Sequence, residues 1–145
     1  MGRSEVMTDK EILQGFEDGS FPKEQWNHAA HLRVAGCYLV GYPAVEALTR
    51  MRDGVKRYNV ASGGKNTEDS GYHETLTCFW IAVAKAYLAE LPDGMTAAAK
   101  VQALVDEFGA RRDLFREYYG FDVLKSREAR ARWVAPDLKG LPGVS

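Results

Sequence analysis

The chain has 145 residues, of which 46% are hydrophobic, and this is enough for one domain with its own core and no disulfides. Its 19 Lys and Arg residues are balanced by 20 Asp and Glu residues, so a net charge of -1 gives no basis for a nucleic-acid groove or an anionic membrane surface. Residues 1–10 lack the apolar core of a signal peptide, and no apolar run reaches the roughly 18 residues that span a bilayer. We therefore expect a cytoplasmic protein whose partner is a small molecule or a second copy of the chain in a homodimer.

Helical patterns begin after a short polar stretch, residues 1–7, which we expect to form a loose arm. Thr8 and Glu11 have the spacing of a capping box, in which each side chain bonds the backbone N–H of the other. The apolar residues that follow predict a first helix to about Asp18. Gly19 is expected to end it, because glycine readily adopts the left-handed conformation found after helices.

Two further helices and a long loop follow. Asn27 is well placed to cap a second helix over residues 28–41. Pro43 opens a third helix, in which apolar residues recur every three or four positions as far as Tyr58. Residues 61–71 are rich in Gly, Ser and Asn and predict the longest loop of the chain. Loops of this length in small domains are often functional, so we expect this one to lie beside a site.

The second half of the chain also contains helical patterns and no alternating pattern typical of a strand. A fourth helix is expected over residues 72–91, a fifth from a cap at Thr96, a shorter sixth over residues 114–119 and a last one over residues 122–134. The Pro- and Gly-rich residues 136–145 predict an extended tail. The expected fold is an all-α, single-domain bundle of five to seven helices covering residues 1–145.

All three histidines of the chain lie in two short motifs at expected helix starts. His28 and His31 belong to the first, residues 26–32, and His73 belongs to the second, residues 71–77. Placed at 100° intervals on a helix, His28 and His31 share the apolar face, and their spacing puts the two rings side by side. If the two helix starts meet in the fold, all three imidazoles will face one interior point.

These side chains predict a metal centre. Three imidazoles can hold zinc and leave a position for water, whereas two imidazoles and a carboxylate suit ferrous iron. Glu74 would be a fourth ligand, a partner that fixes an imidazole tautomer, or a general base for metal-bound water. We therefore expect a divalent metal ion, zinc or iron, held by His28, His31 and His73, with His73 and Glu74 as the catalytic residues.

Aromatic and polar residues near the motifs are candidates for the wall of a substrate pocket. Aromatic residues at helical spacing are also typical of an ordinary core, and a basic residue on the last helix also suits a solvated face. An arginine in such a pocket would bind a carboxylate or phosphate. The candidate substrate-binding residues are Trp26, Tyr38, Tyr58, Asn59, Tyr72, Trp80 and Arg130.

The paired motifs W-x-H-x-x-H-L at residues 26–32 and G-Y-H-E-T-x-T at residues 71–77 resemble those of an uncharacterised family of small bacterial helical proteins. The resemblance extends over about residues 20–82 and implies a helical fold, without an activity, cofactor or substrate. In size and number of histidines the chain is also similar to the helix-bundle metalloproteins of the DinB type. Those proteins take their three histidines from different helices, whereas two of the three here lie on one helix.

The function expected from these residues is that of a metal-dependent hydrolase or lyase acting on a small organic molecule, because a metal lowers the pKa of bound water to about 7. The first alternative is a metal-free acid/base enzyme that uses the same His and Glu side chains. The second is a non-catalytic protein that binds or sequesters a small aromatic molecule, with the histidines as polar anchors. A purely structural or interaction protein is the third.

Overall fold

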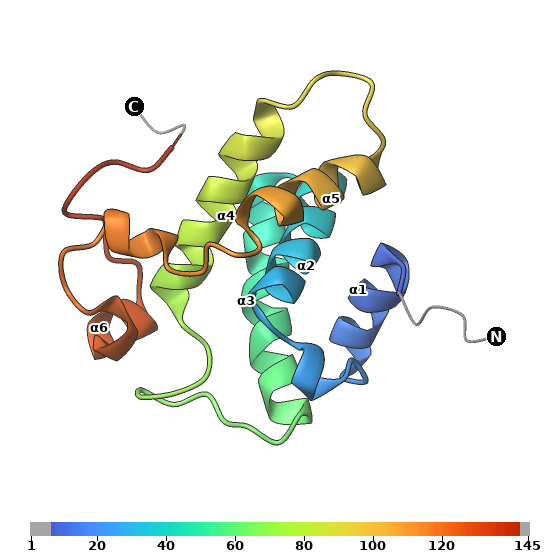
Figure 1. The fold of residues 1–145 in the computed structure, drawn as a ribbon. Helices are drawn as coiled ribbons and strands as arrows, with labels where there is room; N and C mark the ends of the chain where they lie inside the picture. The colour runs from blue at the N-terminus through green and yellow to red at the C-terminus, as the bar shows by residue number, and fades with distance from the viewer. Residues whose placement is uncertain (1–6, 143–145) are drawn as a thin grey trace.

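The computed structural model describes residues 7–142, and within that range the chain forms six α-helices and no strand (Figure 1). The expected all-α bundle is confirmed. None of these helices is both long and apolar enough to cross a membrane. The helices are α1 (Asp9–Asp18), α2 (His28–Gly41), α3 (Ala44–Ala61), α4 (Glu74–Ala89), α5 (Ala97–Phe108) and α6 (Arg127–Ala131), joined in part by 3-10 turns η1 (Lys23–Gln25), η2 (Leu114–Glu117) and η3 (Val123–Lys125).

The first two helices begin and end where local capping predicts. The Thr8 side chain accepts a hydrogen bond from the backbone N–H of Glu11, and the Glu11 carboxylate accepts one from the backbone N–H of Thr8. Gly19 ends α1 in the left-handed conformation, with φ of 83°. The Asn27 side chain accepts a hydrogen bond from the backbone N–H of Ala30 and begins α2. These contacts span at most three residues, so the sequence alone fixes them.

The last part of the chain is more broken than the sequence predicts. Residues 122–134 form η3 and the five-residue α6 instead of one helix. Asp122 accepts a hydrogen bond from the backbone N–H of Lys125, and Ser126 accepts one from the backbone N–H of Ala129. Because Ser126 is extended and caps a new helix, it interrupts the helical pattern that continues on either side of it.

Residues 114–119, expected as a short helix, form only the 3-10 turn η2. The residues of the predicted tail that the structure describes, 136–142, are not helical and fold back on this turn. The backbone N–H of Leu138 donates to the carbonyl of Tyr118 at 2.9 Å. Residues 143–145 of the predicted tail and residues 1–6 of the predicted arm lie outside the described residues, and Met7 packs against the core.

Two apolar clusters make up the core, and α2 contributes to both. One is centred on Phe79 and joins α4 and α5 to the C-terminal segment. The other is centred on Phe16 and Tyr58 and joins α1, α2 and α3. Leu32 near the start of α2 belongs to the first cluster, and Val34 belongs to the second. Helix α2 therefore lies in the middle of the bundle, in contact with α1, α3, α4 and α5 (Figure 1).

Candidate functional site

A cavity of about 850 Å³ lies where the two apolar clusters meet. Its lining comes from η1, the start of α2, α3, the loop over residues 62–73, the start of α4, and η2 with the residues just before it. Such a volume is within the range of small-molecule sites, about 300–1,000 Å³. The aromatic and imidazole side chains in its lining are Trp26, Tyr72, Trp80, Phe115, His28, His31 and His73.

The His31 imidazole lines this cavity, and its ring nitrogens have no hydrogen-bond partner among residues 7–142. Its ring lies over the Trp26 indole with 4.0 Å between the ring centroids. Within residues 7–142, no hydrogen bond is made to either ring nitrogen, although every fully buried side-chain nitrogen or oxygen in that range has a partner. The His31 nitrogens are therefore accessible from the cavity. Burial, with a smaller effect from the neighbouring His28, lowers the pKa of His31 to about 4, so the ring is neutral at pH 7 and offers one donor and one acceptor.

The His28 ring connects α2 to the end of α5. Its Nε2 lies 3.1 Å from the carbonyl oxygen of Phe108, to which the neutral ring donates, and the ring packs on Trp80 with 4.5 Å between centroids. Burial is the main cause of a lowered pKa for His28, and the positive charge of Arg112 adds to it. His28 therefore lines the cavity with one of its nitrogens already engaged.

The His73 ring is a structural group. It caps α4, because Nδ1 accepts a hydrogen bond from the backbone N–H of Leu76 at 3.2 Å. Its Nε2–H donates to the carbonyl of Val123 at 2.9 Å, so both nitrogens are used and the tautomer is fixed. Burial lowers its pKa, and the side chain is 8% exposed. His73 thus connects the start of α4 to η3.

The three histidines share one cavity without forming a ligand set. No group of three or more His, Cys, Asp or Glu side chains within residues 7–142 is arranged to hold a metal ion. Binding through His73 would break either the cap of α4 or the bond to Val123. The predicted centre of His28, His31 and His73 therefore does not fit this arrangement, and we derive no chemical step from a metal.

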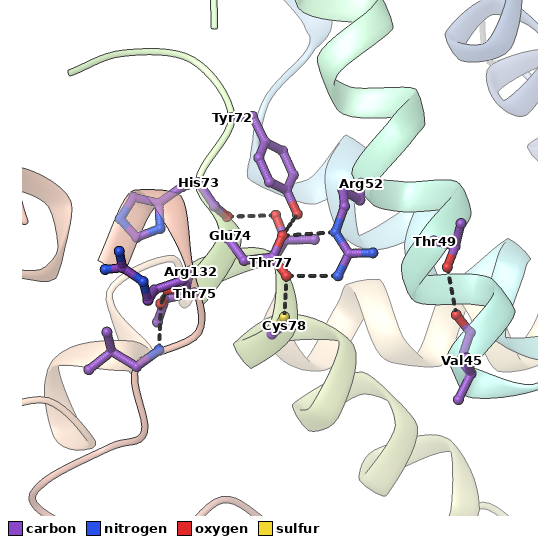
Figure 2. A network of polar contacts seen from close by, with 11 residues as sticks. Val45, Thr49, Arg52, Tyr72, His73, Glu74, Thr75, Thr77, Cys78 and Arg132 are labelled. Carbon is purple, nitrogen blue, oxygen red and sulfur yellow. Dashed lines mark hydrogen bonds and ion pairs between the residues drawn. The ribbon is translucent and has the colours of Figure 1, made fainter. Parts of the chain in front are cut away.

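The carboxylate of Glu74 lies in a closed network outside the cavity lining (Figure 2). Its two oxygens accept hydrogen bonds from Nε and Nη2 of Arg52 at 2.9 and 2.7 Å, from the Tyr72 hydroxyl at 2.6 Å and from the Cys78 thiol at 3.3 Å. The Arg52 hydrogen bonds are the main reason that the pKa of Glu74 is lowered to about 2. A carboxylate with so low a pKa is a weak base. In this structure the Glu74 carboxylate joins α3 to α4 through Arg52, and its role in catalysis stays a prediction that this geometry does not favour.

Three of the predicted pocket residues lie outside the cavity lining, and two of them, Tyr38 and Tyr58, make contacts in the core. The Tyr38 hydroxyl donates to the carboxylate of Glu17, which joins α2 to α1. Tyr58 is 0% exposed, and its hydroxyl donates to the carbonyl of Phe21. Both side chains face inward as the helical pattern predicts, but they serve the core and not the cavity.

Asn59 and Arg130 act on the loop that borders the cavity. Asn59 is in the lining, and its side-chain amide donates to Oδ1 of Asn66 at 2.9 Å. Arg130 is not in the lining and donates to the carbonyls of Gly71 at 2.8 Å and Leu124 at 3.1 Å. Gly71 is in the left-handed conformation, with φ of 83°, and a Cβ there would collide with the loop backbone. The loop over residues 62–73 is therefore held by Asn59 of α3 and by Arg130 of α6.

Three basic side chains in the lining escaped the sequence reasoning. Lys23, Lys65 and Arg112 come from η1, the loop and the segment before η2. Lys23 and Lys65 are single basic residues and Arg112 follows Arg111, and no spacing relates the three to the histidine motifs. Only the folded chain brings them to the same cavity.

Comparisons with known proteins do not place the chain in a family. No protein-family model matches the chain, and neither a curated protein nor a solved structure matches it. The resemblance of the paired motifs to a small bacterial family therefore stays a prediction, and the argument for function rests on the geometry of the cavity.

Proposed function

We propose that this protein binds a small organic molecule in the cavity at the start of α2, with the neutral His31 ring as its central hydrogen-bonding group. The observation that carries the proposal is a cavity of about 850 Å³ lined by His31, whose two ring nitrogens have no hydrogen-bond partner within residues 7–142. A ring nitrogen that is accessible and has no partner in the protein can form a hydrogen bond with water or a ligand.

The aromatic walls support the same proposal. Trp26 stacks on Phe16 with 5.0 Å between centroids, and Trp80 packs edge-on against Phe79 at 5.2 Å. These contacts hold the indoles in place before a ligand arrives. A rigid wall loses little conformational entropy on binding, and this favours affinity. An apolar wall with a few polar groups is typical of small-molecule sites.

The test is a screen of aromatic fragments by ligand-observed NMR and thermal shift. A hit is expected to lose at least about tenfold in affinity in His31→Phe, which keeps a ring on Trp26 but removes both nitrogens and so costs about 1.4 kcal/mol or more. The matched control is Tyr38→Phe on the same helix, which removes a hydroxyl outside the cavity and should leave affinity unchanged. If no fragment binds at millimolar concentration, or if both variants bind alike, the proposal is wrong.

A metal-free acid/base enzyme is the second candidate. It is favoured by the closeness of the two rings, since His28 contributes to the lowered pKa of His31. Two imidazoles on one wall could pass a proton between a ligand and solvent. Turnover that survives strong chelation and is lost in both His28→Phe and His31→Phe would support it. Binding without turnover would leave the non-catalytic proposal standing.

Zinc or iron binding stays a prediction of the sequence. Elemental analysis of untagged protein, purified without chelator, tests it directly. Stoichiometric metal that disappears in His31→Ala and in His73→Ala would support the prediction and would require the His73 ring to leave its present partners. Less than a tenth of an equivalent in the unmodified protein would contradict it.

A further inference from the structure

The charged residues around the cavity are unevenly distributed. Lys23, Lys65 and Arg112 line it, and none of them makes an ion pair within residues 7–142. Asp113 is the acidic residue of the lining, and it lies 3.6 Å from Arg116. Of the fifteen other basic side chains within residues 7–142, eight pair with a carboxylate and seven do not, so it is the gathering of these three at one cavity that matters here.

This positive charge is felt by the histidines of the cavity. Arg112 contributes to the lowered pKa of His28 while Asp113 acts in the opposite direction, and Arg130, which lies outside the lining, contributes to the lowered pKa of His73. In both cases burial is the larger cause. The N-terminal ends of α2 and α4 also border the cavity and add the positive ends of two helix dipoles. An anion entering the cavity would therefore be favoured over a neutral or cationic molecule of the same shape.

We infer that the ligand of this cavity is an aromatic molecule carrying a carboxylate or a phosphate, which places its ring against the tryptophan wall and its anion near Lys23, Lys65 and Arg112. This inference rests on the proposed small-molecule function and adds the chemical class of the ligand. The neutral His31 ring supplies a hydrogen bond to the ligand without adding charge.

The test is a panel in which each aromatic ring carries different charges. It contains 1-naphthoate, indole-3-acetate and naphthyl phosphate as anions, the corresponding amides or alcohols as neutral partners, and naphthylmethylamine as a cation. Dissociation constants are measured by NMR or tryptophan fluorescence in 20 mM and 500 mM salt. We expect the anions to bind at least about tenfold more tightly than their neutral partners at low salt, with the difference shrinking at high salt because exposed charges are screened.

Charge variants identify the residues that matter. Lys23→Gln, Lys65→Gln and Arg112→Gln are each expected to weaken anion binding by about two- to fivefold, the range for an exposed charge, and neutral ligands by less than twofold. Lys85→Gln removes an exposed charge of α4 outside the cavity lining and is the matched control. The Lys85→Gln variant should bind both the anionic and the neutral ligands with unchanged affinity. Far-ultraviolet circular dichroism confirms that each variant is folded. The carboxylate and phosphate members of the panel show which anion is preferred.

The outcomes separate the two proposals. Neutral or cationic members binding as well as the anions would overturn the inference about charge and retain the cavity as a small-molecule site. Anion binding that is equally strong in a variant combining Lys23→Gln, Lys65→Gln and Arg112→Gln would also overturn it. Binding by no member of the panel would overturn the proposed function together with the inference.

Discussion

Glu74 and His31 both lie in the first turns of central helices, yet their surroundings are opposite. The Glu74 carboxylate receives hydrogen bonds from three side chains, whereas the His31 nitrogens receive none within residues 7–142. A fully bonded polar network stabilises a fold and specifies its packing. A polar group left open in a cavity contributes little to folding and is available to a ligand. The contrast indicates a structural contact at Glu74 and is the basis for proposing that His31 binds a ligand.

The largest effect is expected from breaking the closed network. Glu74→Ala leaves the Arg52 guanidinium, the Tyr72 hydroxyl and the Cys78 thiol without their common acceptor. Because losing one partner of a partly buried ion pair strands the other, we expect a loss of about 2–4 kcal/mol in the free energy of unfolding by urea. The control is Glu46→Ala, which removes an exposed pair with Arg50 and should cost less than about 0.5 kcal/mol. Equal losses would show that the network is not a stabilising element.

The next comparison is between two histidines. His73→Ala removes the cap of α4 and the bond to Val123, and we expect it to cost about 1–3 kcal/mol in urea unfolding. His31→Phe removes no hydrogen bond within residues 7–142 and keeps the contact with Trp26, so its cost should stay below about 0.5 kcal/mol. A larger loss in His31→Phe than in His73→Ala would reverse the roles assigned here.

The pH dependence of stability should separate the two regions. The folded-state pKa of His31 is about 4 against an ordinary 6.5, so the unfolded state binds more protons and stability falls as pH drops from 6.5 to 4. The lowered pKa values of His28 and His73 act in the same direction. For Glu74, whose pKa is lowered from 4.5 to about 2, the loss occurs as pH drops from 4.5 to 2.

Melting temperatures measured from pH 8 to pH 2 test this order. His31→Phe should reduce the fall between pH 6.5 and 4 by an amount equivalent to about 1 kcal/mol, and Glu74→Gln should reduce the fall below pH 4.5. His31 is partly open to the cavity, and this limits the size of its effect. If His31→Phe leaves the upper part of the profile unchanged, the ring is not the group that resists protonation.

The smallest effect is expected at the surface. Arg127 pairs with Glu68 and Asp69 of the cavity loop, but all three side chains are more than 60% exposed. Arg127→Gln should therefore change the free energy of unfolding by less than about 0.5 kcal/mol and leave ligand affinity unchanged. A marked loss of affinity would show that the loop needs this pair to hold the cavity.

Much of the local structure follows from the sequence. The caps Thr8, Asn27 and Thr96 lie where the sequence predicts them, and α2 has the predicted bounds, His28–Gly41. The prediction that two helix starts meet is also confirmed, because His28, His31 and His73 line one cavity. These features depend on contacts within one turn of helix or on the apolar face of a helix, both of which can be counted along the chain.

The tertiary structure alone decided what each polar group does. The sequence predicts His73 as a metal ligand, but in the structure its Nε2 bonds the carbonyl of Val123, 50 residues away. The sequence predicts Glu74 as a general base, but its carboxylate pairs with Arg52, 22 residues away. The basic lining of the cavity is assembled in the same way from separate segments. Hydrogen-bond partners at such separations depend on how the helices pack. The sequence by itself therefore determined most of the helices, their caps and the apolar faces that carry the histidines, whereas packing brought the histidines to one cavity and decided which of their nitrogens have partners.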